Sequence, residues 1–452
     1  MSNSSRNSLA VAGLSLGTSL NPLNSSMIAV ALVVLRADFG LDVATVTWVI
    51  TSFYLTSAAG QPLMGRLADR FGPRRLFLAG MLVVAVTCAL APFAPNFALL
   101  CVARVFMALG TATAYPSAVV MVGALVRQAK VESTRPLGRI QMANTSAAAV
   151  GPVVGGLLVS LVGWQALFLV NVPLSLAAIF IVRQFAPADA ERERGSAAEL
   201  LRSSDIPGIL AFVGALMLVM MALLDVLPEL RWWMLGGGAV LAALFVWREL
   251  RFSPPFLDLR LLGRNRPLLL VYLGFAVFNG IYYSAFFGLP QLLQEAAGYD
   301  PGVVGLLMLP LAAMSVVATP FAVRAIDRFG VKRVLIAGVV LLAVAAGSMW
   351  LLTASFAIPL VLAVTALMGV PWAVVSIASS QGMYISTQPQ ERGVAAGIFQ
   401  TCRYLGAITA TVLIGIFYGS GVNQANWGLM VLVMLGLGAV AFVVTLGWRE
   451  QR

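Results

Sequence analysis

Apolar residues occur along this chain in repeated runs, separated by short polar or basic turns. A helix that crosses a bilayer needs about 20 such residues, and these runs have that length. The strands of an outer-membrane barrel would alternate at every second residue in segments of about ten. No such alternation is present in the sequence. The pattern therefore predicts an all-α polytopic membrane protein.

The runs predict fourteen transmembrane helices. They lie near residues 9–35, 44–65, 75–94, 97–126, 138–162, 165–184, 206–226, 231–248, 267–293, 301–325, 332–353, 356–384, 392–419 and 426–447. The first run is too long for the core of a signal peptide, so we expect an uncleaved span. The pair at 206–248 requires Asp225, Pro228, Glu229 and Arg231 to form a short outer turn.

Composition agrees with membrane burial, since 60% of the residues are hydrophobic and 10% are charged. Soluble domains carry about 25% charged residues.

The net charge of +11 would suit a nucleic-acid partner, but 25 of the 29 lysines and arginines fall in alternate loops. This is the positive-inside pattern, and it predicts that both termini are cytoplasmic. We therefore expect a multi-pass protein of a bacterial-type cytoplasmic (inner) membrane and no nucleic-acid partner.

The sequence offers little for catalysis or cofactor binding. It has no histidine, and its three cysteines (Cys88, Cys101 and Cys402) fall inside apolar runs, where we read them as small buried residues. We expect no metal, no cofactor and no enzyme activity, because no Ser–His, Cys–His or metal-ligand constellation is present.

Two basic loops resemble one another. Residues 65–75 contain Asp69-Arg70-Phe-Gly72 before two basic residues, and residues 323–333 contain Asp327-Arg328-Phe-Gly330 in the same arrangement. Such an echo predicts two homologous six-helix halves. We expect an N-terminal half at 1–185, a cytoplasmic linker at 186–205, two inserted transmembrane helices at 206–248, a second linker at 249–266 and a C-terminal half at 267–452.

These motifs resemble the major facilitator superfamily, and other segments resemble its fourteen-span drug/proton antiporter branch. They are the loop at 65–75, Arg104 to Gly110, Gly151-Pro152-Val-Val-Gly155-Gly156, Trp164 to Pro173, Leu289 to Pro310 and Glu391 to Gly406. The resemblance covers almost the whole chain. It implies the major facilitator fold, efflux and multidrug-resistance-like antiport, and it says little about the substrate.

The resemblance also implies a cytoplasmic gate. Its residues would be Gly65, Asp69, Arg70, Gly72 and Arg74, with Asp327 and Arg328 in the second loop. Gly65 would permit a close helix approach, and the charged residues would meet a helix N-terminus across the two halves in the outward-facing state. For Arg74 and Arg75, a purely topological role is an equal alternative.

Small residues mark one face of the fifth span. Gly151, Gly155 and Gly156 lack side chains there, and Pro152 frees a carbonyl and bends the helix. Close helix packing follows from the residues themselves, whereas an antiporter role is implied only by the resemblance.

Polar residues inside the spans predict the substrate cavity. They are Asn24, Arg104, Asn144, Asn279, Gln291, Gln381 and Gln400. Arg104 is costly at this depth and should face a water-filled cavity or pair with backbone carbonyls. Arg403 lies closer to the inner end, so we expect its side chain to extend toward the interface.

None of the eighteen acids lies at the middle of a span, and Asn24 occupies the position where the branch usually has an aspartate. Asparagine cannot ionise, so proton coupling through the first span is in doubt. We therefore expect a secondary active transporter that exports a small anionic, neutral or amphipathic molecule by alternating access, with protons as a candidate coupling ion.

Two alternatives remain: a flippase-like transporter of a lipid or lipid-linked molecule, and an uncoupled facilitator. The expected partners are the small-molecule substrate and membrane lipids, and the expected state is a monomer.

Overall fold

The structure, a computed structural model, describes residues 3–129, 134–189, 205–224, 226–252, 257, 259–388 and 392–448. All elements in these ranges are helices. Thirteen are long and apolar enough to cross a membrane, or fourteen if one bent pair is a single span. The predicted all-α polytopic fold and its number of spans are confirmed.

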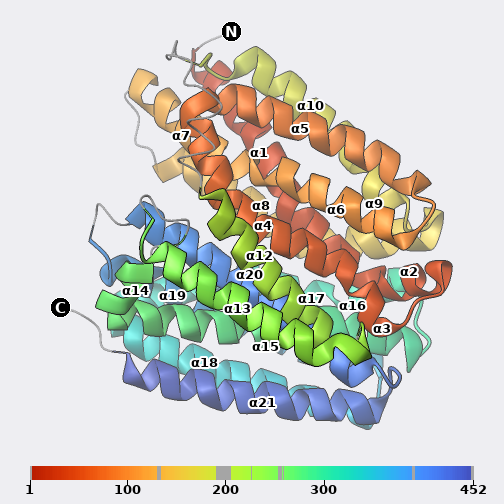
Figure 1. Cartoon of the computed structure of the whole chain (residues 1–452). Coiled ribbons are helices and arrows are strands. Elements are labelled where there is room, and N and C mark those ends of the chain that lie inside the picture. Colours follow the sequence, from red (N-terminus) through yellow and green to blue (C-terminus); the bar gives the residue numbers. More distant parts are fainter. Residues whose placement is uncertain are drawn as a thin grey trace.

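The helices up to residue 185 pack together as an N-terminal bundle (Figure 1). They are α1 (Asn3–Met27), α2 (Leu32–Phe39), α3 (Val43–Val46), α4 (Trp48–Phe71), α5 (Pro73–Leu90), α6 (Phe97–Ala112), α7 (Ala114–Ala129), α8 (Thr134–Val162), α9 (Ala166–Leu169) and α10 (Asn171–Phe185), with 3-10 turns η1 (Ile28–Val30) and η2 (Ala91–Phe93).

The helices from residue 259 onward form a C-terminal bundle. They are α14 (Leu259–Arg264), α15 (Arg266–Glu295), α16 (Pro301–Leu307), α17 (Leu309–Phe329), α18 (Val331–Ser348), α19 (Ile358–Ile385), α20 (Arg392–Tyr418) and α21 (Gln424–Gly447), with the 3-10 turn η4 (Met349–Thr353). The exact division into halves and linkers stays a prediction, and most of the predicted linker at 186–205 lies outside the described residues.

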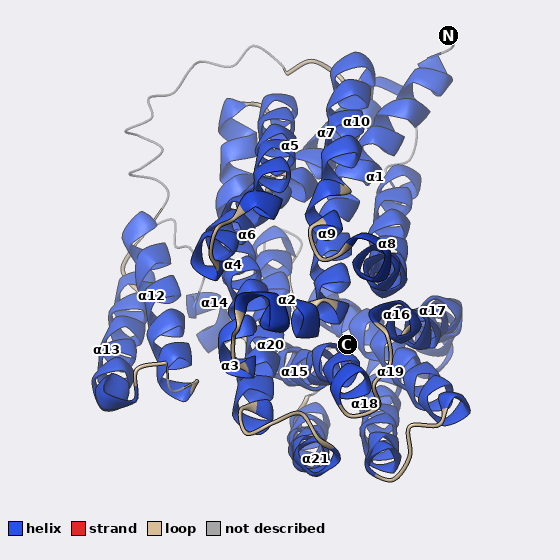
Figure 2. Cartoon of the chain, turned by 90° about the vertical axis from the view of Figure 1, so that its right-hand side faces the viewer, coloured by secondary structure: helices blue, strands red, loops and turns tan. Residues whose placement is uncertain are grey.

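Two further helices, α12 (Ile206–Leu223) and α13 (Arg231–Glu249), form a hairpin through the turn η3 (Pro228–Leu230). Phe212 and Phe245 pack against each other with ring centroids 5.3 Å apart. Figure 2 shows the hairpin beside the two bundles, where α12 contacts α4 and α20. Asp225, predicted in its outer turn, lies outside the described residues.

The first span is bent, which the sequence did not predict. The segments Arg6–Val30 and Leu32–Phe39 meet at 65°. The hydroxyl groups of Ser25 and Ser26 donate to the carbonyl of Pro22 at 3.0 and 2.8 Å just before the bend. Such back-bonding, together with a proline, weakens the helical ladder and favours a bend.

The two similar loops adopt the same turn. Gly72 separates α4 from α5 with φ +97°, and Gly330 separates α17 from α18 with φ +84°. Positive φ favours glycine, since a Cβ would be strained there. The shared glycine spacing in the sequence thus reflects a shared backbone geometry at the end of each bundle.

In Figure 1, α1 begins at the top and α21 ends at the left, and these two points lie at the same end of the molecule. We call this the basic end, because the arginine-bearing turns at Gly72 and Gly330 lie there, and the opposite end the distal end. Two helices that start from the distal end, α6 and α21, have polar caps. Asn96 accepts from the backbone N–H of Leu99, and Asn423 accepts from that of Asn426, both at 2.9 Å. Such caps satisfy a helix's first free N–H groups.

Candidate substrate-binding site between the bundles

Asn24 forms a reciprocal pair with Asn171. Its Nδ2 donates to Oδ1 of Asn171 at 2.6 Å, and Nδ2 of Asn171 donates back to Oδ1 of Asn24 at 2.8 Å. Each Nδ2 also donates to a carbonyl in its own chain segment, that of Leu20 or of Leu167. Both side chains are buried. The predicted cavity residue Asn24 is therefore part of a satisfied contact between α1 and α10.

Arg104 is buried between α6 and α4. Its Nε donates to the carbonyl of Val49 at 3.0 Å, and its guanidinium carbon lies 4.4 Å from the ring centroid of Phe53. Nη1 contacts the sulfur of Met107 at 3.7 Å. The side chain is 1% exposed, and Nη2 has no hydrogen-bond partner among the described residues. Of the two expectations for Arg104, the structure shows carbonyl pairing, supplemented by an aromatic face.

An aromatic cluster joins the two bundles, and sequence reasoning missed it. Tyr54 of α4 contacts Tyr283 and Phe287 of α15 and Tyr404 of α20, with ring centroids 5.7 to 6.1 Å apart. Gln61 of α4 donates to the hydroxyl oxygen of Tyr404. These rings lie within apolar runs of three helices, where the sequence gives no sign that they face a partner bundle.

Arg403 of α20 lies at one side of this cluster. Its Nε donates to the hydroxyl oxygen of Tyr283 at 3.0 Å, and its guanidinium carbon lies 5.4 Å from the ring centroid of Trp372. Trp372 in turn stacks on Tyr282, with centroids 4.1 Å apart. The expectation that Arg403 extends toward the interface is wrong, because aromatic groups within the C-terminal bundle hold it. Arg403 and Trp372 both remain half-buried.

The other predicted cavity residues do not converge on one site. Asn279 and Gln291 are both buried on α15. Nδ2 of Asn279 and Nε2 of Gln291 each donate to the backbone carbonyl four residues earlier. Twelve residues of helix separate them by about 18 Å. Gln381 is exposed, and Asn144 and Gln400 are half-buried. The Oδ1 atoms of Asn279 and Asn144 have no hydrogen-bond partner among the described residues.

The first gate loop is held within its own bundle. The carboxylate of Asp189 accepts from the backbone N–H groups of Arg74 and Arg75 at 2.9 and 3.0 Å, which caps the start of α5. The Arg74 side chain donates to the carbonyl of Arg183. A Cβ at Gly72 would lie 2.4 Å from the Asp189 carboxylate. Among the described residues, the contacts of Arg74 therefore lie with Asp189 and Arg183 and not across the halves.

Gly65 and the charged residues of the second gate loop are loosely surrounded. A Cβ added at Gly65 would find its nearest neighbour, Pro116, at 3.9 Å, so the predicted close approach is not made here. Asp327 and Arg328 are exposed, and Arg328 lies over the ring of Phe329, 5.2 Å from its centroid. Arg70 is half-buried, and the side chain of Asp69 lies outside the described part of the chain.

The small-residue face of α8 packs as predicted. Gly151 contacts Ser26, and a Cβ at Gly155 would lie 2.7 Å from the carbonyl oxygen of Met27. Gly156 faces the other bundle, where a Cβ would lie 2.4 Å from the carbonyl oxygen of Pro301 in α16. Reciprocally, a Cβ at Gly305 would lie 2.5 Å from the carbonyl oxygen of Pro152. The glycines thus bring α8 against both α1 and α16.

The bundles meet most closely at the distal end. Arg36 forms an ion pair with Glu295 at 2.7 Å, and Nε2 of Gln294 donates to the carbonyl of Val30 at 2.9 Å. The hydroxyls of Thr51 and Thr411 share a hydrogen bond at 2.9 Å. In contrast, a Cβ at Gly123, Gly138 or Gly397, nearer the basic end, would meet nothing within 4 Å. This conformation is therefore closed at the distal end.

These features define a helical transporter with two bundles around a central polar and aromatic interface. The profile of the Major Facilitator Superfamily matches residues 14–411, and the chain belongs to that family. The chain is 36% identical over 431 residues to an uncharacterized MFS-type transporter, YwoD, of Bacillus subtilis, covering 95% of this chain and 94% of YwoD.

A second relative is the tetracenomycin C resistance and export protein of Streptomyces glaucescens. It is 31% identical over 435 residues, which cover 92% of this chain and 76% of that protein. Among solved structures, a bacterial homologue of the human lysosomal transporter Spinster, in an inward-facing and unoccupied conformation, matches with a TM-score of 0.68 and 14% identity. The match covers 97% of both chains and supports the shared fold.

Proposed function

We propose that this protein is a secondary active exporter of a planar amphipathic molecule that is neutral or anionic. The observation that carries the proposal is the Arg403–Trp372–Tyr283 group, which presents a cation and aromatic faces beside the contact between the bundles. Aromatic rings stack on planar ligands, and a guanidinium attracts negative charge. The similarity to a tetracenomycin C export protein supports export as the direction.

The charge balance of the core favours the same class. Arg104 and Arg403 are the two arginines that the sequence places within spans, and none of the eighteen acids falls at the middle of a span. A simple organic cation would meet positive charge without a nearby carboxylate, which costs binding free energy at low dielectric. We therefore infer selection against cations.

Alternating access explains the asymmetry between the two ends. With both termini in the cytoplasm of a bacterial-type inner membrane, as the positive-inside pattern predicts, the distal end faces outward. The Arg36–Glu295 pair and the Gly156–Gly305 crossing then close the outer side. A monomer suffices for this cycle, and a proton gradient is the candidate driving force.

The test is transport of a panel of aromatic compounds into inverted membrane vesicles, with an imposed pH gradient. The panel contains tetracenomycin C, other planar anions and planar cations. Trp372→Ala should raise KM for the transported anion or neutral compound about tenfold, from the loss of stacking worth about 1 kcal/mol or more. Arg403→Gln should raise KM for anions more than for neutral compounds.

Trp350→Ala is the matched control, because Trp350 is also partly exposed but lies in η4 at the distal end. It should leave KM unchanged. Equal KM values for wild type, Trp372→Ala and Arg403→Gln would show that the aromatic group does not contact the substrate. Preferential transport of cations would overturn the proposed substrate class.

A further inference from the structure

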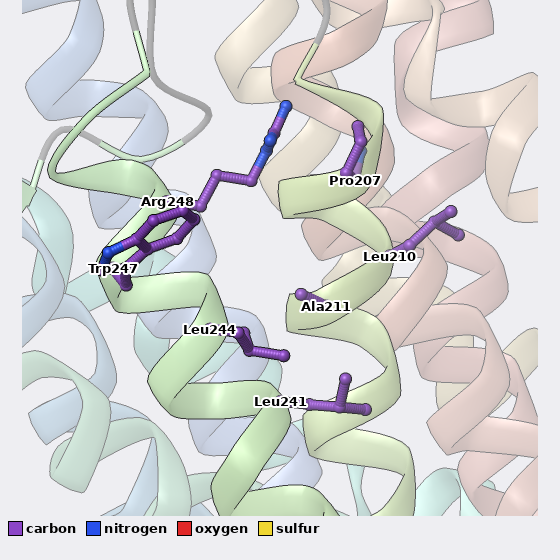
Figure 3. Close-up of a pocket in the computed structure, with 7 residues that line it drawn as sticks. All are labelled: Pro207, Leu210, Ala211, Leu241, Leu244, Trp247 and Arg248. Atoms are coloured by element: carbon purple, nitrogen blue, oxygen red, sulfur yellow. The ribbon is translucent and has the colours of Figure 1, made fainter.

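A groove lies between α12 and α13 on the outer side of the hairpin (Figure 3). Its volume is about 370 Å³, and its walls are almost entirely apolar. They are formed by Pro207, Leu210 and Ala211 of α12 and by Leu241, Leu244 and Trp247 of α13, with Arg248 at the basic end. We call it the hairpin groove.

The groove lies on the part of the molecule that is least covered by protein. Of the thirteen candidate spans in the described ranges, α13 has the smallest buried share. Leu210 and Leu244 are 65% and 50% exposed. In a span, such side chains face hydrocarbon, so the groove is filled by the apolar part of a neighbouring molecule.

The dimensions suit a hydrocarbon chain better than a helix. The floor is tight, because a Cβ at Gly214 would lie 3.0 Å from Leu241 and one at Gly238 would lie 2.8 Å from Val219. A helix with its side chains is about 10–12 Å wide and cannot enter the space between two helices packed this closely. A single acyl chain can lie along it.

Two arginines, Arg248 and Arg251, and two buried carboxylates, those of Asp205 and Glu249, lie at the basic end of the groove, and Arg251 is the exposed charge among them. Arg248 is 30% exposed at its side chain, and its Nε donates to the buried carboxylate of Asp205. This contact holds the guanidinium in place. Figure 3 shows Arg248 at the mouth of the groove. Arg251 is exposed and lies over the ring of Trp247, 4.9 Å from its centroid. Tryptophan and arginine at the end of a span are typical of the headgroup level.

We propose that the hairpin groove binds an anionic phospholipid. One acyl chain lies between α12 and α13, and the headgroup phosphate lies between the guanidinium groups of Arg248 and Arg251. Guanidinium groups bind phosphate oxygens through charge-assisted hydrogen bonds. The site is separate from the central interface and does not depend on which substrate the protein transports.

The test is native mass spectrometry of the full-length protein with phosphatidylglycerol or phosphatidylcholine of identical acyl chains. The wild type should retain phosphatidylglycerol about fivefold better, as one basic residue near a membrane surface contributes about 1 kcal/mol. Arg251→Gln should reduce phosphatidylglycerol retention about fivefold and phosphatidylcholine retention less, because the choline ammonium already offsets the charge of the same phosphate. Ala211→Trp should abolish retention of both lipids at this site, and Leu244→Asn should weaken it.

Two matched controls address non-specific effects. Arg324 also lies over an aromatic ring, that of Phe321, at 5.7 Å from its centroid, but does not line the hairpin groove, so Arg324→Gln should retain lipid as wild type does. Ala439→Trp adds the same bulk on the exposed face of α21 and should also have no effect. Equal retention of the two lipids, or wild-type retention by Arg251→Gln and Ala211→Trp, would overturn the proposal. A dimer that Ala211→Trp disrupts would instead assign the groove to a second copy of the chain.

Discussion

Asn24 and Asn171 satisfy each other through two reciprocal amide hydrogen bonds, at 2.6 and 2.8 Å, between α1 and α10. An isolated amide would be costly at this depth, because the bilayer core supplies no water to bond its donors and acceptor. The pair explains how a polar residue is tolerated at a position where the resemblance implies an aspartate.

The first prediction concerns the coupling within this pair. Asn24→Leu should lower the free energy of unfolding by about 1–3 kcal/mol, because it leaves Oδ1 of Asn171 buried without a donor. Asn171→Leu should do the same to Asn24. The loss of unfolding free energy in the double variant should be smaller than the sum of the two single losses by at least about 0.5 kcal/mol. Reversible unfolding in mixed micelles measures all three. Additive costs would show that the two amides do not act as a pair.

The second prediction concerns the coupling ion. Asn24→Asp places an ionisable group at the position of the missing carboxylate, beside the acceptor Oδ1 of Asn171. We expect transport into inverted vesicles to gain or change its dependence on pH, because this carboxyl group can take up and release a proton. Asn24→Gln, which adds length without charge, is the control. An unchanged pH profile in Asn24→Asp would place Asn24 outside the transport path.

Wild-type coupling is tested in the same vesicles. Accumulation of substrate driven by a pH gradient should depend on groups outside the first span. Asp38 is one such group, and its carboxylate accepts from the indole N–H of Trp164 at 2.5 Å. If accumulation persists after Asp38, Asp69 and Asp225 are each replaced by Asn, the inference drawn from the missing carboxylate is wrong.

The sequence predicted the spans, the echo of the two loops and the crowded glycines of α8, because each leaves a local signal. A long apolar run indicates a transmembrane helix. A glycine at positive φ or at a close helix crossing is hard to replace, because every other residue carries a Cβ. Gly72 and Gly330 in the loops, and Gly156 on α8, were therefore recognisable from the sequence, whereas the partner of Gly156 was not.

The aromatic cluster could not be predicted in the same way. In a soluble helix, the face that packs on the core is marked by a period of 3.6 residues, but a span is apolar on the lipid side too. Tyr282, Tyr283, Phe286 and Phe287 form two adjacent pairs within such a run, and all four are buried. The position of Arg403 was misjudged for the same reason, since its aromatic partners come from α15 and α19.

The third prediction concerns Arg104, which is buried with its Nε on the carbonyl of Val49. A charge at the centre of a span costs about 2.5–3.5 kcal/mol on insertion scales. Arg104→Met keeps the length and removes that cost, so its thermal stability should equal or exceed that of the wild type. Transport should nevertheless fall at least tenfold if the charge serves the transport cycle. Arg104→Lys separates charge from shape, because lysine lacks the planar group that lies over Phe53. Wild-type transport by Arg104→Met would reduce Arg104 to a structural residue.

The fourth prediction concerns Asp189, which caps α5 through the backbone N–H groups of Arg74 and Arg75. Asp189→Ala should lower the free energy of unfolding by about 0.5–2 kcal/mol, the usual cost of losing a helix cap. Asn423→Ala removes a cap at the distal end and should be similarly destabilising. Because Asp189 also holds the gate loop within its own bundle, only Asp189→Ala should change the transport rate per folded molecule. Equal effects of both variants on that rate would limit Asp189 to capping.

The fifth prediction concerns the crossing of Gly156 and Gly305, which closes the distal end. Gly156→Leu cannot fit there, since even its Cβ would lie 2.4 Å from the carbonyl oxygen of Pro301. Overpacking costs about 1–3 kcal/mol, so the population should shift toward conformations in which the two bundles are apart at this end. A cysteine placed at the buried Thr51, in a background without Cys88, Cys101 and Cys402, should then react about tenfold faster with an impermeant maleimide applied from the distal side. Gly138→Leu is the control on the same helix, because a Cβ at Gly138 meets nothing within 4 Å. An equal labelling rate in Gly156→Leu and Gly138→Leu would show that this crossing does not control access to the distal side.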